Sequence, residues 1–565
     1  MDTNNNTQKW FSDFRKTPEY AEFSKRPVAY FSAEYALLSA LPTYAGGLGI
    51  LSADYIREAK KEGFPILAVG LLYRKAQNSV LSAGKPDLTT EEANLSLVKL
   101  ENGERVLISL PIYDKKVFAQ VWQMNENGTL IYLLDTNISE NEPNERDITL
   151  NLYDENREMR FKQEMLLGIG GLRLLETLGH HPSVYHLNEG HSAFLALELI
   201  HHEMKHQRVD FHTASEYAKK HIVFTNHTLV AAGQEQFGKD QVSAIMAKYA
   251  EEIGIPVADI IALGGIDGTN IFSMTIFSFK LAAKANAVSK LHRDTARGIW
   301  NQYSMESITN GIYIPRWDKV ENGENDLAGA HIKNKKKLLQ YIKDKSGKDW
   351  SENDLIIGWA RRLVPYKRPL ALFEDIEKLL EVLKKSDQKI KLVFSGPTRN
   401  DDFGSNELAL KLKNIFDEKL SNNAVFLTNY SIEVSELMTS GTDIWLNTPV
   451  VGSEACGTSG MKALLNGSLP FSTSDGWIAE INLSEMGWLI EEPDISNKAL
   501  SILENDIFPL YKKYVENPTD SIWLQKMQKG RKLIQDNFST SRMLKEYIEI
   551  LYIPTLREKH PHRFD

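Results

Sequence analysis

The residues most suggestive of chemistry lie in "SEACGTSGMKALLNGSL", residues 453–469, where a glycine-bracketed loop leads into a predicted helix with Lys462 just inside it. Glycines beside a helix start let the backbone approach an anion closely. A lysine at this place can hold a phosphate as a point charge or anchor a carbonyl cofactor covalently. The ATP P-loop pattern fails because Thr458, not lysine, follows Gly457. The stretch alone therefore leaves a phosphate site and a covalent anchor open.

A second cluster, "GWARRLVPYKRP" (residues 358–369), places Arg361, Arg362, Lys367 and Arg368 directly after a predicted strand. Runs of charge usually cover a solvated face. This run, however, follows the carboxyl end of a strand in a chain of net charge −9. Fixed cations at such a place favour a phosphate site.

Three further loops carry glycine, histidine or asparagine. In "YAGGLGILSADYI", Gly46 and Gly47 precede a predicted helix and form either an anion loop or a tight turn, and Ser52 breaks the dinucleotide-binding fingerprint. "YHLNEGHSAF" and "FTNHTLV" follow strands, and their histidines either recognise sugar hydroxyls or are buried and satisfied by the backbone. His227 is the stronger candidate of the two loops. In "ITNGIYIPRW", Asn310 lies in a turn where its amide can reach a ligand.

A His-Glu-x-x-His pattern at His202, Glu203 and His206 matches the start of a zinc-protease site. We discount it because Lys205 adds a cation and the flanks read as a solvated helix end. The sequence suggests no third ligand nearby, so we expect no metal.

The amino-acid composition excludes several classes of function for this chain. The 565 residues are 42% hydrophobic and 25% charged, which indicates a globular chain, and the acidic balance argues against nucleic acid or an anionic membrane as partner. The chain has one cysteine, Cys456, and therefore cannot form an intrachain disulfide. The lack of an intrachain disulfide is compatible with a reducing compartment. The N-terminus lacks a secretory signal pattern, and no run approaches ~18 apolar residues. We expect a cytoplasmic protein.

Two stretches alternate strands and helices in the same order. Residues 26–35, 53–63 and 64–73 read as strand, helix and strand, and residues 354–362, 369–386 and 389–397 repeat the pattern. The polar segment 318–350 shows no buried strand. We therefore predict two α/β domains, 1–335 and 336–565, the second ending in a helix over 540–556. Ligands of such sheets bind at the carboxyl ends of the strands.

Taken together, the motifs of this chain resemble those of a known family. "EACGTSGMKALLN" is similar to the cofactor-lysine signature of the α-glucan (glycogen, starch, maltodextrin) phosphorylases, in particular their short prokaryotic branch. The other loops follow in the family's order from residue 28 to residue 490: AGGLG, LNEGH, TNHT, TNGI, RRLVPYKR and DGWIAEI. The resemblance implies two Rossmann-like α/β domains facing across a cleft, the GT-B-type glycosyltransferase fold.

The resemblance also implies roles for residues. Lys462 would hold pyridoxal 5′-phosphate as a Schiff base, and the cofactor's phosphate would be bound by Arg361, Thr458 and Ser459. The substrate phosphate would be bound by Arg362, Lys367 and the loop of Gly46, Gly47 and Leu48. The glucosyl unit would be held by His227, Asn310, Glu454, Cys456, Gly457 and Tyr366. Of these, Lys462, Arg362, Lys367, His227 and Glu454 are the expected catalytic residues.

The implied reaction is reversible phosphorolysis of a terminal α-1,4 glucosyl unit of a glucan, with retention, to α-glucose 1-phosphate. The cofactor's phosphate would relay a proton, since its second pKa lies near ~6. A nucleotide-sugar glucan synthase on the same fold and a non-catalytic glucan-binding relic remain alternatives. The family also implies a homodimer, and the short chain leads us to expect no allosteric control. Cys456 replaces a common serine, Val364-Pro365 replace His-Glu, and the loop Ser395–Asp402 departs from the family pattern.

Overall fold

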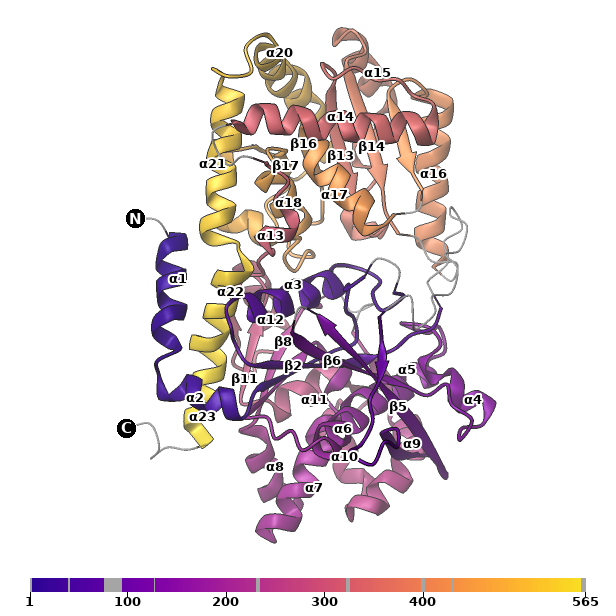
Figure 1. The fold of residues 1–565 in the computed structure, drawn as a ribbon. Coiled ribbons are helices and arrows are strands. Elements are labelled where there is room, and N and C mark those ends of the chain that lie inside the picture. The colour runs from indigo at the N-terminus through magenta and orange to yellow at the C-terminus, as the bar shows by residue number, and fades with distance from the viewer. Residues whose placement is uncertain are drawn as a thin grey trace.

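The computed structural model describes residues 3–38, 41–75, 94–126, 128–229, 234–321, 326–397, 402–428 and 430–559. Two α/β halves, each built on its own sheet, lie one above the other in Figure 1. The mixed α/β class with parallel sheets that the sequence predicts is confirmed, and it fits the GT-B-type fold.

The first sheet has the strand order β12-β11-β8-β7-β1-β2-β6-β5-β3, with β4 paired to β5. Its strands are β1 (Val28–Ser32), β2 (Ile66–Leu71), β3 (Ser96–Leu97), β4 (Leu107–Ile112), β5 (Lys115–Glu126), β6 (Thr129–Asp135), β7 (Val184–Asn188), β8 (Ile222–Asn226), β11 (Lys284–Ala287) and β12 (Glu306–Ser307). The strands from β12 to β6 run parallel, whereas β5 is antiparallel to its neighbours. A separate ribbon pairs β9 (Gln236–Gly238) with β10 (Ile271–Ser273).

The second sheet is wholly parallel, in the order β15-β14-β13-β16-β17-β18. Its strands are β13 (Leu355–Ala360), β14 (Ile390–Ser395), β15 (Ala424–Leu427), β16 (Ile444–Asn447), β17 (Leu469–Ser472) and β18 (Trp488–Leu489). Numbered along the chain from β13, this is the 3-2-1-4-5-6 order of doubly wound sheets. Strands β13 and β14 are buried along their whole length, as parallel strands covered on both faces are.

Helices cover both faces of the second sheet. Ile356 of β13 packs with α14 (Leu327–Ser346) and α17 (Ile432–Gly441) on one face. Its neighbours Leu355 and Ile357 point the other way, into the core that includes α15 (Ile376–Lys385), α16 (Phe403–Lys419) and α19 (Ile495–Ile502). The alternation follows from the two-residue period of a strand.

Helices also surround the first sheet (Figure 1). They are α3 (Gly47–Lys61), α4 (Pro143–Arg146), α5 (Arg157–Met165), α6 (Gly171–Thr177), α7 (Leu195–Gln207), α8 (Phe211–Lys219), α9 (Lys239–Ile253), α10 (Val257–Gly264), α11 (Met274–Leu281) and α12 (Lys290–Ile299). Helix α13 (Ile314–Trp317) lies at the boundary between the halves. The predicted βαβ unit is confirmed by the parallel pairing of β1 with β2 around α3. Helix α3 begins at Gly47, earlier than the predicted residue 53, so the glycines open it.

The chain crosses between the halves and then returns. Helix α14 occupies much of the polar segment 318–350, and the predicted domain boundary between 335 and 336 lies inside it. That division stays a prediction. Beyond α18 (Ser459–Leu465) and α20 (Phe508–Glu516), the helices α21 (Ile522–Asn537), α22 (Thr540–Glu546) and α23 (Ile553–Lys559) run down one side of both halves in Figure 1, beside α1 (Thr3–Phe14) and near α2 (Pro18–Lys25). The predicted C-terminal helix is confirmed.

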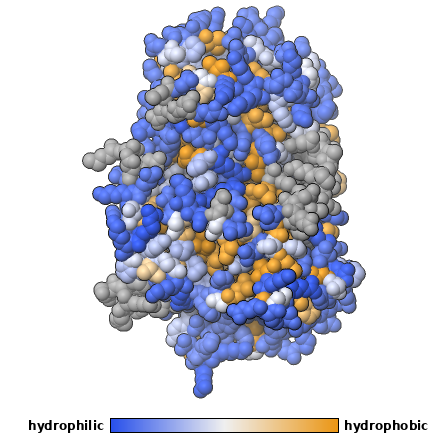
Figure 2. Space-filling model, in the orientation of Figure 1, coloured by the Kyte–Doolittle hydropathy of each residue, from blue (hydrophilic) through white to orange (hydrophobic). Residues whose placement is uncertain are grey.

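The surface in Figure 2 is mainly hydrophilic at both ends, and apolar side chains gather in the middle of this face, where the halves meet. Within the described ranges, no helix has both the length and the apolar character that crossing a membrane requires.

Candidate active site

The basic loop and the lysine loop meet at the switch point of the second sheet. Strands β13 and β16 are neighbours, although β14 and β15 lie on the far side of β13. The loop after β13 carries Arg361 and Lys367, and the loop after β16 carries Glu454. Doubly wound sheets bind ligands at this crevice beside the carboxyl ends of the strands.

A buried carboxylate joins these two loops. Glu454 Oε2 lies 2.6 Å from Lys367 Nζ and 3.1 Å from Arg361 Nη1, and Arg361 Nη2 donates to Ser459 Oγ at 3.1 Å. Burial alone would raise the pKa of Glu454, but the charges of Lys367 and Arg361 outweigh it and hold that pKa below its usual value. The cluster is therefore two cations sharing one anion, with a net positive charge left for a ligand.

Asp475 supports the loop that carries Glu454. Its carboxylate accepts the backbone N–H groups of Ser453 at 3.2 Å and Glu454 at 2.8 Å. Burial raises the pKa of Asp475 to about 6. The next residue, Gly476, has φ +56° and approaches Cys456 so closely that a Cβ would lie 2.3 Å from its carbonyl oxygen. The motif DGWIAEI in the sequence does not by itself indicate this role of Asp475.

Arg362 lies apart from this cluster. Its side chain is 59% exposed, and Nη2 is 3.7 Å from Asp402 Oδ2. The structure does not bring Arg362 to Glu454 or Lys367, so its contact with a substrate phosphate stays a prediction. Residues 398–401 of the divergent loop Ser395–Asp402 lie outside the described residues.

Lys462 occupies a buried place one turn into α18, where the sequence placed it. Its Nζ lies 3.8 Å from the ring centroid of Trp317. Burial lowers the pKa of Lys462 to about 7. An amine with this pKa is substantially neutral near pH 7, and only the neutral form attacks a carbonyl carbon.

Two polar side chains fix the surroundings of Lys462. Asn466 Nδ2 donates to the carbonyl oxygens of Lys462 and Trp317, both at 2.8 Å. Asp54 of α3 accepts Trp317 Nε1–H at 2.7 Å and lies 3.1 Å from Arg316 Nη1. The ring beneath the lysine is thus held from both halves.

Thr458 and Ser459 differ in what they touch. Ser459 Oγ accepts from Arg361, whereas Thr458 precedes α18 and its carbonyl oxygen accepts the backbone N–H of Lys462. Tyr366 lies next to the cluster, with its ring centroid 5.1 Å from Lys367 Nζ, and its carbonyl oxygen accepts from Val450. Of the predicted cofactor-side residues, the structure therefore joins Arg361 to Ser459 and Thr458 to Lys462.

The glycine loop of the first half already holds an anion, the carboxylate of Glu34. Its Oε2 accepts the N–H groups of Ala45 at 2.8 Å and Gly46 at 3.1 Å, and Tyr153 donates to its Oε1 at 2.5 Å. A Cβ at Gly46 or Gly47 would meet nothing within 4 Å, so their outer side is open. Leu48 lies in the first turn of α3, where its carbonyl oxygen accepts from Ser52.

His227 follows the end of β8 and is held by Asn188 at the end of the neighbouring strand β7. Its Nε2 lies 2.7 Å from Asn188 Oδ1, and its backbone N–H donates to Glu189 Oε2 at 3.3 Å. Burial lowers the pKa of His227 to about 3, so the ring is neutral. Glu189 has φ +72°, which strains a non-glycine residue, and burial raises its pKa to about 7. The sequence showed these loops but not the link through Asn188.

Asn310 and Cys456 meet where the two halves touch. Ser289 of the first half donates from Oγ to the carbonyl oxygen of Ala455 at 2.6 Å. Asn310 Oδ1 is buried and has no hydrogen-bond partner among the described residues. Burial raises the pKa of the Cys456 thiol, and Gly457 takes φ +81°. Asn310 therefore presents a free acceptor at this junction.

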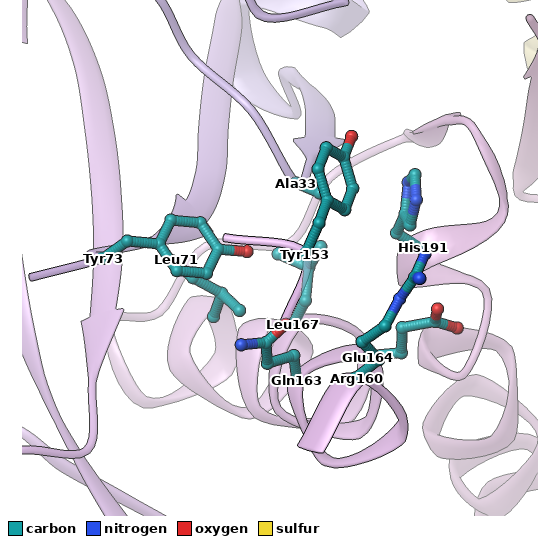
Figure 3. A pocket seen from close by; sticks show the side chains of 9 residues that line it. All are labelled: Ala33, Leu71, Tyr73, Tyr153, Arg160, Gln163, Glu164, Leu167 and His191. Carbon is teal, nitrogen blue, oxygen red and sulfur yellow. The ribbon is translucent and has the colours of Figure 1, made fainter. Parts of the chain in front are cut away.

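A small pocket lies behind the glycine loop in the first half (Figure 3). It is lined by Ala33, Leu71, Tyr73, Tyr153, Arg160, Gln163, Glu164, Leu167 and His191. In the described part of the chain, Glu164 Oε2 and His191 Nδ1 are buried without a hydrogen-bond partner. Both atoms can accept hydrogen bonds from hydroxyl groups.

The His-Glu-x-x-His pattern falls on α7. His202 Nδ1 lies 2.8 Å from Glu176 Oε1, and the hydrogen bond and charge of Glu176 raise the pKa of His202 against the effect of burial. No group of three or more His, Cys, Asp and Glu side chains placed to hold a metal ion occurs in the ranges that the structure describes.

Comparisons with known proteins agree on one family. Residues 316–487 match the family described as carbohydrate phosphorylase. The maltodextrin phosphorylase of Thermococcus litoralis is 34% identical over 97% of this chain and 72% of its own length. The glycogen phosphorylases of Aquifex aeolicus and Mycobacterium tuberculosis are each 30% identical over 96% of this chain, covering 88% and 73% of their own lengths. On this evidence, the chain belongs to the α-glucan phosphorylase family.

Proposed function

We propose that this protein cleaves α-glucans by phosphorolysis, releasing terminal α-1,4-linked glucosyl units as α-glucose 1-phosphate with retained configuration. The observation that carries the proposal is the cluster of Arg361, Lys367 and Glu454 at one switch point, next to the helix that carries the buried amine of Lys462. Family membership supplies the reaction class, and its named members are maltodextrin and glycogen phosphorylases.

The residues at this switch point fit pyridoxal 5′-phosphate. Lys462 offers a buried amine with a pKa of about 7. Arg361 Nε is buried and has no hydrogen-bond partner in the described ranges, so the guanidinium keeps a donor for a phosphate. Lys462 would hold the cofactor, and Arg361, Thr458 and Ser459 would hold its phosphate. When bound, the cofactor supplies a phosphate whose second pKa near ~6 suits proton exchange at neutral pH.

The chain's own cations bind the two phosphates, Lys367 the reacting one and Arg361 that of the cofactor. Lys367 Nζ and the Arg361 guanidinium are fixed by Glu454 before any ligand arrives, so little rearrangement is needed. Two neighbouring phosphates repel each other strongly, and fixed cations offset that repulsion. Arg362 would join them by leaving its exposed position beside Asp402.

Neutral groups bind the sugar. His227 donates or accepts without carrying a charge, because its pKa of about 3 keeps it neutral. Asn310 Oδ1 is free to accept from a glucosyl hydroxyl. The substrate phosphate gives its proton to the glycosidic oxygen as that bond breaks, and a phosphate oxygen then bonds to the anomeric carbon from the same face. This route needs no pair of carboxylates of the glycosidase type.

A nucleotide-sugar synthase is not favoured by the relatives, because those named above are phosphorylases.

The deciding experiment measures glucose 1-phosphate released from maltodextrins of graded length with inorganic phosphate. We expect release from wild type, and no release at any length would overturn the proposal. A readout independent of activity follows the loading of apo-protein with pyridoxal 5′-phosphate by absorbance at about 330–430 nm. Because the neutral amine reacts, the loading rate should rise as pH increases through about 7 and level off above it.

A further inference from the structure

Glu480 is a buried carboxylate of the second half whose hydrogen bonds come from the first half. Its Oε1 accepts the backbone N–H of Lys290 and the hydroxyl of Thr309, both at 2.9 Å, and its Oε2 lies 3.0 Å from the same hydroxyl. The Lys290 ammonium is a further 3.9 Å contact, and the Glu480 side chain is only 8% exposed. The carboxylate therefore binds two separate segments of the other half at once.

The first of these segments is the start of α12. Lys290 is the first residue of α12, and Ser289 caps it by accepting the His292 N–H at 3.1 Å. A carboxylate at this place is favoured by the unpaired N–H groups and by the helix dipole. Ser289 also donates to the Ala455 carbonyl oxygen at 2.6 Å. The start of α12 is thus fixed between Glu480 and the loop that contains Glu454.

The second segment is the turn that contains Asn310. Thr309 precedes Asn310, and its carbonyl oxygen accepts from Arg542 Nη2 at 2.6 Å. Asn310 in turn donates its backbone N–H to the Val288 carbonyl oxygen at 3.1 Å. The contacts of Glu480 therefore determine where Asn310 stands relative to Cys456, across the boundary between the halves.

We propose that Glu480 is a positioning residue that clasps the two halves and fixes the width of the sugar site. It holds Thr309 and the start of α12 against residues 454–456, so Asn310 and Glu454 reach one glucosyl unit from opposite sides. This inference rests on the proposed function, since it assigns the sugar site to these residues. Contacts between domains are commonly polar and permit relative motion. A buried carboxylate that bridges the two halves therefore influences their relative position.

The clasp predicts a large kinetic effect from a residue that touches no substrate. A displacement of about 1 Å at a reacting site can cost roughly 100-fold in rate. We expect Glu480→Ala to lower kcat/KM for maltodextrin about 10- to 100-fold, mainly through kcat. Glu480→Gln keeps an acceptor oxygen for the Lys290 N–H and should lose less. The absorbance of the bound cofactor should stay unchanged in both variants.

The matched control is Glu485→Ala, which removes a carboxylate a few residues away. Glu485 is 50% exposed and contacts Asn482 and Lys529 of its own half. Kinetics, thermal melting and hydrogen exchange would be measured on wild type and all three variants. The clasp predicts faster exchange at residues 306–312 and 453–457 in Glu480→Ala and not in Glu485→Ala.

Two results would overturn the inference. One is a kcat/KM for Glu480→Ala within twofold of that for Glu485→Ala. The other is unchanged exchange at both segments. A double-mutant cycle adds a further test, because Thr309→Val should have little additional effect once Glu480 is alanine. If wild type itself released no glucose 1-phosphate, the proposed function would fail, while the exchange comparison would still decide whether Glu480 joins the halves.

Discussion

The two sheets present opposite chemistry at their switch points. At the second sheet, Arg361 and Lys367 surround the carboxylate of Glu454, whose pKa is lowered by those charges against the effect of burial. The switch point of the first sheet lies between β1 and β7. Beside it, His227 after β8 is neutral, and burial raises the pKa of Glu189 after β7 to about 7. One edge holds its charge by pairing, and the other suppresses charge by desolvation.

The difference matches the two ligands that the proposed reaction requires. A phosphate needs fixed cations, which would be unstable in a buried site without an internal anion such as Glu454. A glucosyl unit is neutral and needs donors and acceptors that do not attract counter-ions. The glycine loop combines features of both edges, because its N–H groups already donate to a carboxylate of the protein itself, that of Glu34.

The largest effect should come from Lys462→Ala at the charged edge. Without the amine, the cofactor has no covalent anchor, so we expect loss of the absorbance band and of all glucose 1-phosphate release. Lys384→Ala removes an exposed lysine of α15 and serves as the control. A variant that is colourless yet fully active would contradict the assignment of Lys462.

Alanine substitutions of the adjacent residues Arg361 and Arg362 should have very different effects on stability. Arg361→Ala leaves Glu454 with one cation in a buried site. The free energy of unfolding should fall by about 3–5 kcal/mol, and phosphorolysis should be lost. Arg362→Ala removes an exposed side chain and should change stability by no more than about 0.5 kcal/mol. The denaturation midpoints and the KM for phosphate of both variants would be compared. A raised KM for phosphate in Arg362→Ala with unchanged stability would support its movement into the site.

Much of this arrangement could be predicted from the sequence. The strand-helix-strand pattern placed Lys462 and the basic loop at carboxyl ends of strands, because periodicity is a local property. Which of Arg361 and Arg362 points inward could not be predicted, since neighbours on a loop have no fixed period. The pairing of Glu34 with residues 45 and 46 depends on a turn closed over eleven residues. The polar segment 318–350 concealed α14, because its buried residues lie among many lysines.

The same substitution should act in opposite directions at the two edges. Glu454→Gln leaves Arg361 and Lys367 without their anion and should lower stability at pH 8 by about 2 kcal/mol. Folding raises the pKa of Glu189 from 4.5 to about 7, so the native state retains a proton between those values that the unfolded state has released. Wild-type stability therefore falls as pH rises from 4.5 to 7, and Glu189→Gln removes that loss. At pH 8 this variant should be more stable by as much as about 3 kcal/mol.

Denaturant unfolding of both glutamine variants at pH 5 and pH 8 measures this contrast. The advantage of Glu189→Gln should shrink at pH 5, where native Glu189 is already protonated. If both variants were destabilised at pH 8, the Glu189 carboxylate would be stabilised by partners in the same way as that of Glu454. The contrast between the two edges would then be lost.

The smallest effect on activity should come from the glycine loop, through Tyr153→Phe. The hydroxyl of Tyr153 donates to Glu34 Oε1 at 2.5 Å, and its loss removes a hydrogen bond to a charged group, worth about 1.5–3 kcal/mol. Because Glu34 would still accept from Ala45 and Gly46, the loop should loosen rather than unfold, and the KM for phosphate should rise several-fold with kcat nearly unchanged. Tyr217→Phe, on exposed α8, is the control. If stability falls and the KM for phosphate stays constant, Tyr153 supports only the fold, and the glycine loop belongs with the neutral edge.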